Sequence, residues 1–185
     1  MISGRSERGF TLIEVLIVIA IIGILAALLI PNALTAIQKA KQKSTMKDVT
    51  TIATAMMDYL TDHGVSPVAT GTAMTVGSGL YADLSPFYVK AMPINDQWGK
   101  PFAIYGGSEC EGQYGVKAST VTVIGVDDFI VASNGRDGTA NDEYDETDPA
   151  ATQYVVSGMA DFNRDLVNWD GSWIIGPIRR AGGTS

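Results

Sequence analysis

The chain has 185 residues, which is enough for one modest domain and an anchor but not for two full cores. Its net charge is −7, and residues 64–185 hold 15 acidic against seven basic side chains. We expect so acidic a region to repel nucleic acid, which binds clustered Lys and Arg. The single cysteine, Cys110, excludes an intrachain disulfide.

An apolar run from Phe10 to Ile30 follows the short basic segment MISGRSER, and Glu14 is its only charged residue. The run is longer than the apolar core of a secretory signal, about 7–15 residues, and matches the roughly 20 residues of a membrane-spanning helix. Gly9, the natural processing point, precedes the run, so cleavage there leaves the apolar helix on the mature protein. We therefore predict a leader at residues 1–9 and a transmembrane helix at 10–34.

Helical sequence continues beyond Pro31, because no other glycine or proline occurs before Gly64. Pro31 removes a backbone donor and is expected to break or bend the helix locally. The rear half is amphipathic, with one apolar face formed by Val49, Ile52, Ala53, Met56 and Leu60. A helix from Phe10 to His63 would be roughly 80 Å long, too long to be buried in the rest of the chain.

The remainder of the chain, within a domain predicted at 35–185, alternates turns with short β-like runs. Residues 64–79 are rich in Gly, Ser and Thr and are predicted to form a connecting loop. Predicted strands follow at 102–105, 113–117, 120–126, 129–133, 153–157 and 172–178. We expect an α+β fold in which a small, mainly antiparallel sheet packs against the amphipathic half of the helix.

Glu14 needs an explanation, because an unpaired carboxylate inside a bilayer costs upward of about 2.5 kcal/mol. After cleavage at Gly9, the α-amine of Phe10 lies one helical turn away, in the same chain or in a staggered neighbour, and could pair with it. Glu14 would then set the register between helices. The alternative from depth alone is a side chain that reaches the lipid headgroups.

The segment RGFTLIEVLIVIAIIGILAALLIP, residues 8–31, resembles the N-terminus of type IV pilins and type II secretion pseudopilins with a class III signal. The resemblance implies a pilin-like fold, cleavage by prepilin peptidase between Gly9 and Phe10, and N-methylation of Phe10. It further implies that Glu14 guides assembly into a homopolymer. The implied partners are an inner-membrane assembly platform and minor pseudopilins or pilins, with the domain in the bacterial periplasm.

Four lysines argue against a periplasmic location for the residues that follow the apolar run. Lys39, Lys41, Lys43 and Lys47 lie just beyond the apolar run, on the side that the resemblance places in the periplasm. The positive-inside tendency favours such residues in the cytoplasm. The N-terminal block is the more specific signal of the two.

Two internal segments are similar to parts of major pseudopilins. NDQWGKPFAIY at 95–105 is similar to their Asp-Pro-Trp-Gly-Asn-Pro-Tyr segment, with Gln97 in place of the usual proline, and SNGRDG at 133–138 is similar to the opening of their calcium loop. Residues 137–148 hold six carboxylates and no basic residue. Calcium takes six to eight oxygens on such loops, and the alternative is a solvated acidic loop. The predicted ligands are Asp137, then Asp142 and Asp145, and the carbonyl of Asn134.

We therefore predict a structural filament subunit without catalytic residues, most simply the major pseudopilin of a type II secretion system. A type IV pilin for adhesion or motility is the first alternative, and an anchored calcium-binding receptor or enzyme is a remote one. An acid–base pair at Asp127 and Asp128 would not converge on a strand, where neighbours face opposite ways. DFNRD at 161–165 begins like an EF-hand loop but lacks its glycine and final glutamate, and His63 is expected to be an ordinary helix-end residue.

Overall fold

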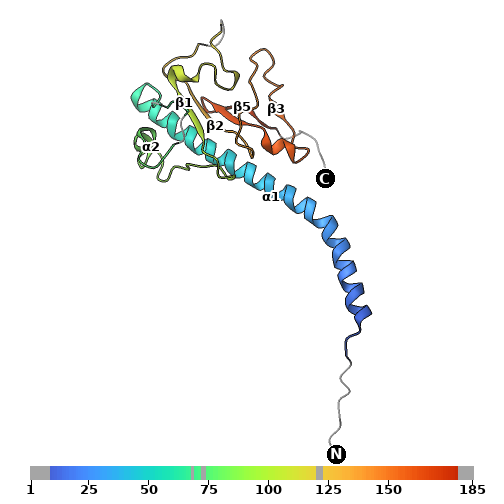
Figure 1. Ribbon diagram of the computed structural model, residues 1–185. Helices are drawn as coiled ribbons and strands as arrows, with labels where there is room; N and C mark the ends of the chain where they lie inside the picture. The colour runs from blue at the N-terminus through green and yellow to red at the C-terminus, as the bar shows by residue number, and fades with distance from the viewer. Residues whose placement is uncertain (1–8, 68, 72–73, 120–122, 179–185) are drawn as a thin grey trace, which may run out of the picture. The chain divides into compact units, whose positions relative to one another are not determined.

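A computed structural model describes residues 9–67, 69–71, 74–119 and 123–178 (Figure 1). The chain divides into two compact units, residues 1–37 and 38–185. All strands lie in the second unit. The predicted leader falls outside the described residues except for Gly9.

Helix α1 runs from Leu12 to His63 and confirms the predicted long helix, which begins two residues later than expected. It does not end at Pro31, which lies inside the helical span; a local bend there stays a prediction. The helix stops at Gly64, where φ is 71° and the amide donates to the carbonyl of Leu60 at 2.7 Å. Glycine enters this left-handed conformation without a Cβ penalty, which makes it a common helix terminator.

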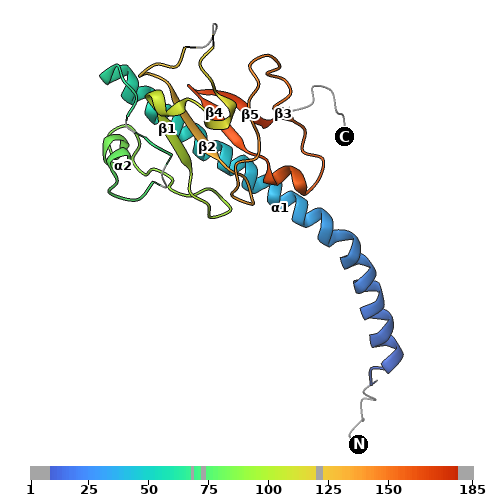
Figure 2. The ribbon, with the colours of Figure 1, turned by 45° about the horizontal axis from the view of Figure 1, so that its top comes forward.

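The rear half of α1 crosses one face of a sheet, as Figures 1 and 2 show. On the predicted apolar face, Val49, Ile52, Ala53 and Met56 are buried, whereas Leu60 is only partly buried. This face therefore covers the sheet as expected, with Leu60 at the margin of the contact.

The sheet has five strands in the order β1-β2-β4-β5-β3, and all neighbours are antiparallel except β3 and β5. The strands are β1 (Ala103–Gly106), β2 (Phe129–Ser133), β3 (Gln153–Tyr154), β4 (Leu166–Trp169) and β5 (Ser172–Pro177). The α+β prediction is confirmed, and so are four of the predicted strands, although β3 is shorter than the predicted 153–157.

The predicted strand 113–117 is wrong, and the predicted strand 120–126 is wrong over its described residues. Residues 113–117 form no strand, because Tyr114 and Gly115 both have positive φ, 48° and 80°, which no β-strand accommodates. Gln113–Gly115 form a short, irregular 3₁₀ turn instead. In the predicted strand 120–126, residues 120–122 lie outside the described part and 123–126 form no strand. The alternating apolar residues of 113–117 are nevertheless buried, since Tyr114 and Val116 both belong to the core.

The sequence reading also missed two elements. Helix α2 spans Gly79–Leu84, and Ser78 caps it by accepting the amide of Tyr81. Strand β4 joins β5 through a two-residue turn in which Asp170 and Gly171 have φ values of 47° and 81°. Asp-Gly favours such turns because both residues tolerate positive φ.

The interior strand β2 is buried at all five positions and separates two apolar clusters. Phe129 and Val131 pack with Ile52 of α1 and its neighbours, while Ile130 and Ala132 belong to the opposite cluster. The acidic loop begins immediately after this strand, so its first residues are anchored by the most buried part of the sheet.

Both outer strands of the sheet have little open edge. Outside β1, Thr70 forms an antiparallel bridge with Tyr105, and the amide of Gly106 donates to the carbonyl of Ala69 at 2.9 Å. On the other side, β3 is only two residues long. The chain's own loop therefore covers part of the β1 edge.

Candidate functional site

The front of α1 presents a continuous apolar surface. Within the 1–37 unit, the large side chains from Leu12 to Ile30 are exposed, Leu28 by 67%. Among the described residues, α1 is the one helix long and apolar enough to cross a membrane, and its most apolar window has no buried residue. Such a surface is not stable in water and needs either lipid or other apolar helices around it.

Glu14 caps the first turn of this helix. Its Oε2 accepts the backbone amide of Thr11 at 2.8 Å and the Thr11 hydroxyl at 2.7 Å, while the amide of Glu14 donates to the same hydroxyl at 3.3 Å. This is a capping box, in which Thr at the N-cap and Glu three residues later satisfy each other's amides. The sequence TLIE carries that signal, which the sequence reading of Glu14 did not use.

Segment 95–105 begins with a tight turn built on a buried carboxylate. Asp96 is 5% exposed, and its Oδ1 accepts the amides of Trp98 and Lys100, both at 2.9 Å. Its Oδ2 accepts the hydroxyl of Ser133 at 2.8 Å. Asp96 thus joins this turn to the last residue of β2, where the acidic loop starts.

The same turn is fastened to α1. The indole N–H of Trp98 donates to Oε1 of Gln38 at 2.8 Å. Gln97 donates its amide to the Thr45 hydroxyl at 3.2 Å and its side-chain Nε2 to Asp48 at 2.8 Å. A proline at 97 could make neither bond, so the departure from the usual pattern adds contacts with the helix.

In the middle of the acidic loop, Asp142 pairs with Arg164. The Arg164 Nη2 lies 2.8 Å from Asp142 Oδ1, and its Nε lies 3.1 and 3.3 Å from the two carboxylate oxygens. Asp142 Oδ2 also accepts the amide of Asp165 at 2.9 Å. Both oxygens of this predicted calcium ligand are therefore already in use.

Asp165 is a buried carboxylate that the sequence reading did not select as a site. Its Oδ2 accepts the amides of Asn141 and Asp142 at 2.7 and 2.8 Å. Its Oδ1 is buried with no hydrogen-bond partner among the described residues. Burial raises the pKa of Asp165 to about 6, against the lowering effect of the two amides.

The remaining predicted ligands near the start of the loop are engaged in local turns. Asp137 accepts the amide of Thr139 with Oδ1 at 3.1 Å and the side-chain Nδ2 of Asn141 with Oδ2 at 3.3 Å. The carbonyl of Asn134 accepts the amide of Gly138 at 3.1 Å. These bonds hold the SNGRDG turn in shape.

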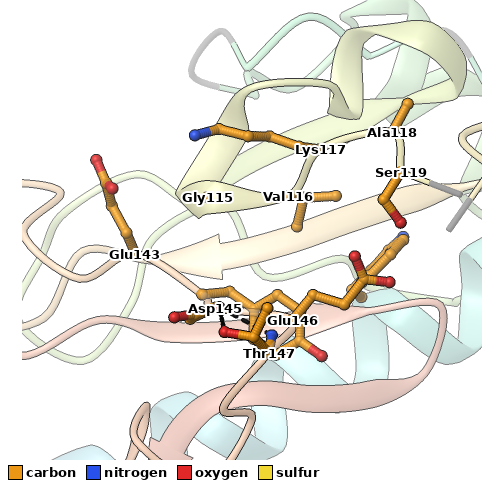
Figure 3. A pocket seen from close by; sticks show the side chains of 11 residues that line it. Gly115, Val116, Lys117, Ala118, Ser119, Glu143, Asp145, Glu146 and Thr147 are labelled. Carbon is orange, nitrogen blue, oxygen red and sulfur yellow. Dashed lines mark hydrogen bonds between the residues drawn. The ribbon is translucent and has the colours of Figure 1, made fainter. Parts of the chain in front are cut away.

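Asp145 lies in a different place, on an open groove of about 630 Å³ lined by residues 115–119 and 143–147 and by Trp169 (Figure 3). Its Oδ1 accepts the amide and the hydroxyl of Thr147 at 2.8 and 2.6 Å. Those bonds hold the pKa of Asp145 below its usual value. The carboxylates of the loop therefore separate into two locations.

A calcium shell would need six to eight oxygens around one point. Two buried side-chain oxygens lack a hydrogen-bond partner among the described residues, Asp165 Oδ1 and Asn168 Oδ1, and of the two only Asp165 contacts the acidic loop. Among the same residues, no three His, Cys, Asp or Glu side chains come together as metal ligands. As placed, the predicted ligands Asp137, Asp142, Asp145 and Asn134 do not fit such a shell. Calcium at this loop stays a prediction of the resemblance.

The DFNRD segment does not form an EF-hand loop. Residues 160–163 are a 3₁₀ helix, and Asp161 Oδ2 accepts the amides of Ser157 and Gly158 at 2.7 and 2.8 Å. The two residues of this segment that contact the acidic loop are Arg164 and Asp165. No local sequence pattern predicts their pairing with residues more than 20 positions earlier.

Comparison with known proteins decides the family. Residues 4–30 match the prokaryotic N-terminal methylation motif. The type II secretion system core protein G of Aeromonas hydrophila is 30% identical over 146 residues, covering 75% of this chain and 91% of that protein. The chain belongs to the type II secretion system core protein G family. Its resemblance to pseudopilins, stated above from the sequence, is confirmed.

Other core protein G sequences agree. That of Pectobacterium carotovorum is 29% identical over 146 residues, covering 76% of this chain and 85% of that protein, and that of Vibrio cholerae is 32% identical over 110 residues, covering 53% and 70%. The core protein G family consists of major pseudopilins, which are structural subunits. With the methylation motif, family membership makes this chain a filament-forming, membrane-anchored subunit and a substrate of a processing peptidase.

Proposed function

We propose that this core protein G polymerises through α1 into a periplasmic secretion pseudopilus, after prepilin peptidase cuts between Gly9 and Phe10 and methylates the new amine. The proposal rests chiefly on the exposed apolar half of α1. The precursor would span the inner membrane once, with the 38–185 unit in the periplasm. An assembly platform and minor pseudopilins are the partners of this scheme, and the subunit itself would catalyse nothing.

Apolar burial alone does not explain why such a helix would leave the membrane. Covering a Leu or Ile side chain contributes about 1.5–3 kcal/mol relative to water. Lipid tails cover it equally well, so moving the helix from lipid into a bundle of similar helices gains little from the hydrophobic effect. A polar interaction that forms only in the bundle must therefore direct assembly.

Glu14 can supply that interaction. Both cap bonds from Thr11 end on Oε2, and within the described residues Oε1 is left for a cation. The amine created at Phe10 by cleavage is such a cation, and in the assembled filament it could belong to a neighbouring subunit. A buried pair of this kind is costly to break, at about 3–5 kcal/mol, because one charge is then left alone.

The lysines at 39, 43 and 47 fit this orientation better than the positive-inside tendency suggests. All three are exposed on the rear half of α1, which also buries Val49 against the sheet. They therefore belong to the folded domain, and a folded domain that is translocated as a unit is not subject to the short-loop charge rule.

Two substitutions separate the cap from the charge pair. Glu14→Gln keeps an oxygen that can accept the Thr11 bonds but removes the charge, whereas Thr11→Ala removes the hydroxyl and keeps the charge. We expect Glu14→Gln to reduce sheared, pelletable filaments at least about tenfold and Thr11→Ala to reduce them far less. Loss of the leader, measured by mass spectrometry, must be equal in both variants.

Wild-type filament yield in Glu14→Gln would refute the charge pair. Equal loss in the two variants would assign Glu14 to helix capping instead. Either result would leave family membership intact, because that rests on the comparisons.

A further inference from the structure

Arg164 lies where the acidic loop meets the sheet, between a carboxylate and an aromatic ring. Its guanidinium binds Asp142 through two nitrogens, with a shortest distance of 2.8 Å. Its central carbon lies 4.1 Å from the centre of the Tyr154 ring. The planar guanidinium suits both Asp142 and Tyr154, since guanidinium groups bind carboxylates through two nitrogens and stack on aromatic faces.

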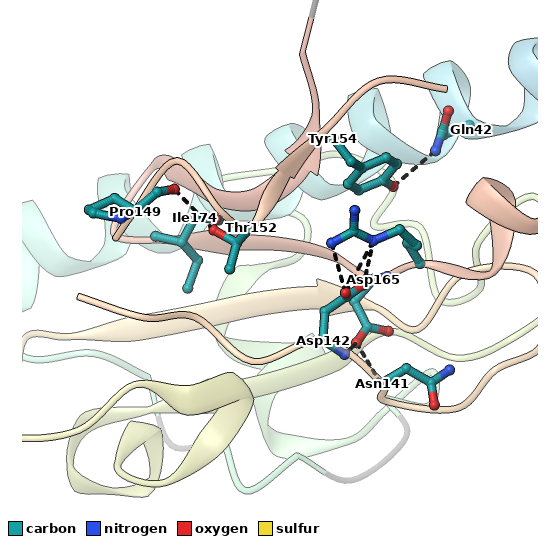
Figure 4. Close-up of polar contacts among 9 residues, drawn as sticks. Gln42, Asn141, Asp142, Pro149, Thr152, Tyr154, Asp165 and Ile174 are labelled. Carbon is teal, nitrogen blue, oxygen red and sulfur yellow. Dashed lines mark hydrogen bonds and ion pairs between the residues drawn. The ribbon is translucent and has the colours of Figure 1, made fainter. Parts of the chain in front are cut away.

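Backbone amides form mutual hydrogen bonds with the two carboxylates at the same place. Asp142 accepts the amide of Asp165, and Asp165 accepts the amides of Asn141 and Asp142, all between 2.7 and 2.9 Å. Figure 4 shows Asn141, Asp142 and Asp165 facing one another across this contact. The middle of the loop is thereby fixed to Asp165, the residue directly before β4.

Tyr154 extends the contact to the helix. Its hydroxyl accepts the side-chain Nε2 of Gln42 at 3.1 Å, and Gln42 is 4% exposed within α1 (Figure 4). A connected series therefore runs from the loop at Asp142, through Arg164 and the ring of Tyr154 in β3, to the rear half of α1. All of these residues lie in the 38–185 unit.

We propose that the guanidinium of Arg164 takes the role that the resemblance gives to calcium, so that this subunit holds its acidic loop without a metal. Asp142, a predicted calcium ligand, is neutralised by Arg164, and a divalent cation placed beside it would be repelled by the same guanidinium. The predicted ligand Asp145 is on the groove instead. Pinning the loop by a resident side chain makes the fold independent of the calcium concentration around it.

The wild-type protein gives the first test and needs no variant. The full-length chain in detergent is titrated with calcium by calorimetry. Hydrogen exchange of residues 137–153 is then measured once in about 5 mM calcium, enough to saturate a weak extracellular site, and once with excess chelator. We expect no specific heat of binding and equal exchange in both conditions. Saturable binding, or exchange that rises when calcium is removed, would overturn the proposal and support the calcium prediction.

Variants of Arg164 and Arg136 give the second test. Arg164→Gln removes the cation, and Arg136→Gln is the matched control because Arg136 donates to the neutral side chain of Asn163 at 2.9 Å. We expect exchange of residues 137–153 to rise roughly tenfold or more in Arg164→Gln, since charge-assisted hydrogen bonds are lost, and much less in Arg136→Gln. Equal exchange in wild type and Arg164→Gln would overturn the proposal.

Arg164→Lys covers the case in which Arg164→Gln does not fold. Lysine keeps the charge but cannot bind Asp142 through a planar fork or stack in the same way. We expect exchange between that of wild type and that of a fully released loop, and wild-type exchange would refute the specific role of the guanidinium. None of these measurements depends on filament assembly, so they stand or fall separately from the proposed function.

Discussion

Replacing Asp170 with asparagine is expected to stabilise the protein at alkaline pH and to leave it unchanged at acidic pH. Asp170 is in the β4–β5 turn and accepts the amide of Phe129 at 2.8 Å. Burial, and then a hydrogen bond with the carboxyl of Asp128, raise the pKa of Asp170 to about 7. Asparagine tolerates the positive φ at this position and can still accept from Phe129 and donate to Asp128.

The expected magnitude follows from the change in pKa, from 3.8 to about 7. Because the pKa of Asp170 is higher in the folded protein, its contribution to the free energy of unfolding is complete below about pH 4, where the carboxyl is protonated. That contribution is lost as the pH rises through about 7. At about 1.36 kcal/mol for each pKa unit, the difference of 3.2 between 3.8 and about 7 corresponds to roughly 4.4 kcal/mol, and solvent screening at this partly exposed carboxyl reduces the expected loss to about 3 kcal/mol. Asp165, with its pKa of about 6, also lowers the free energy of unfolding as the pH rises. The Asp170→Asn variant keeps this second pH dependence.

The assay is urea unfolding of the full-length protein in detergent at pH 4, 6 and 8. Trp169 is a suitable fluorophore, since its indole N–H donates to Asp128 at 3.2 Å beside the titrating pair. Asp83→Asn is the control, because it changes the net charge equally at an exposed position in α2. The reasoning fails if Asp170→Asn shifts the free energy of unfolding by the same amount at pH 4 and pH 8.

Three further outcomes are expected. Gly9→Leu should leave an uncleaved precursor in the membrane, detected by its mass, and mature-sized protein would contradict the cleavage site. Trp98→Phe should lower the free energy of unfolding by about 1 kcal/mol through loss of the indole bond to α1, and an unchanged denaturation midpoint would contradict that. Gly115→Ala should destabilise more than Gly112→Ala, because both glycines have φ near 80° but only at Gly115 would a Cβ overlap the Tyr144 backbone; equal melting temperatures would contradict it.

The sequence predicted the parts of the fold that depend on local pattern. A 52-residue helix without internal glycine, except Gly23 in the apolar run, and with a clear terminator at Gly64 could be identified from composition. Strand β2 was found at its exact bounds because FIVAS is apolar throughout and buried on both faces. Strand β4, Leu166–Trp169, was missed because it is short and includes Asn168, a buried polar residue.

In the candidate site, too, the residue marked by a local pattern was predicted and the contact between distant residues was not. Glu14 was identified because one charge in an apolar run is anomalous by itself. The pairing of Asp142 with Arg164 was not, because it joins residues far apart in sequence through the antiparallel packing around β4. The acidic run suggested a metal because the charges of a sequence can be counted, whereas the cation that neutralises one of them depends on the fold.

The covered edge of β1 has a consequence for a protein that must self-associate at high local density. Crowded subunits with free strand edges could join by backbone pairing and grow into β-aggregates. Here Thr70 and Ala69 already occupy hydrogen-bonding positions beside β1, and β3 offers a template of two residues. Disordered growth through the sheet is thus disfavoured, and ordered growth is left to the helix.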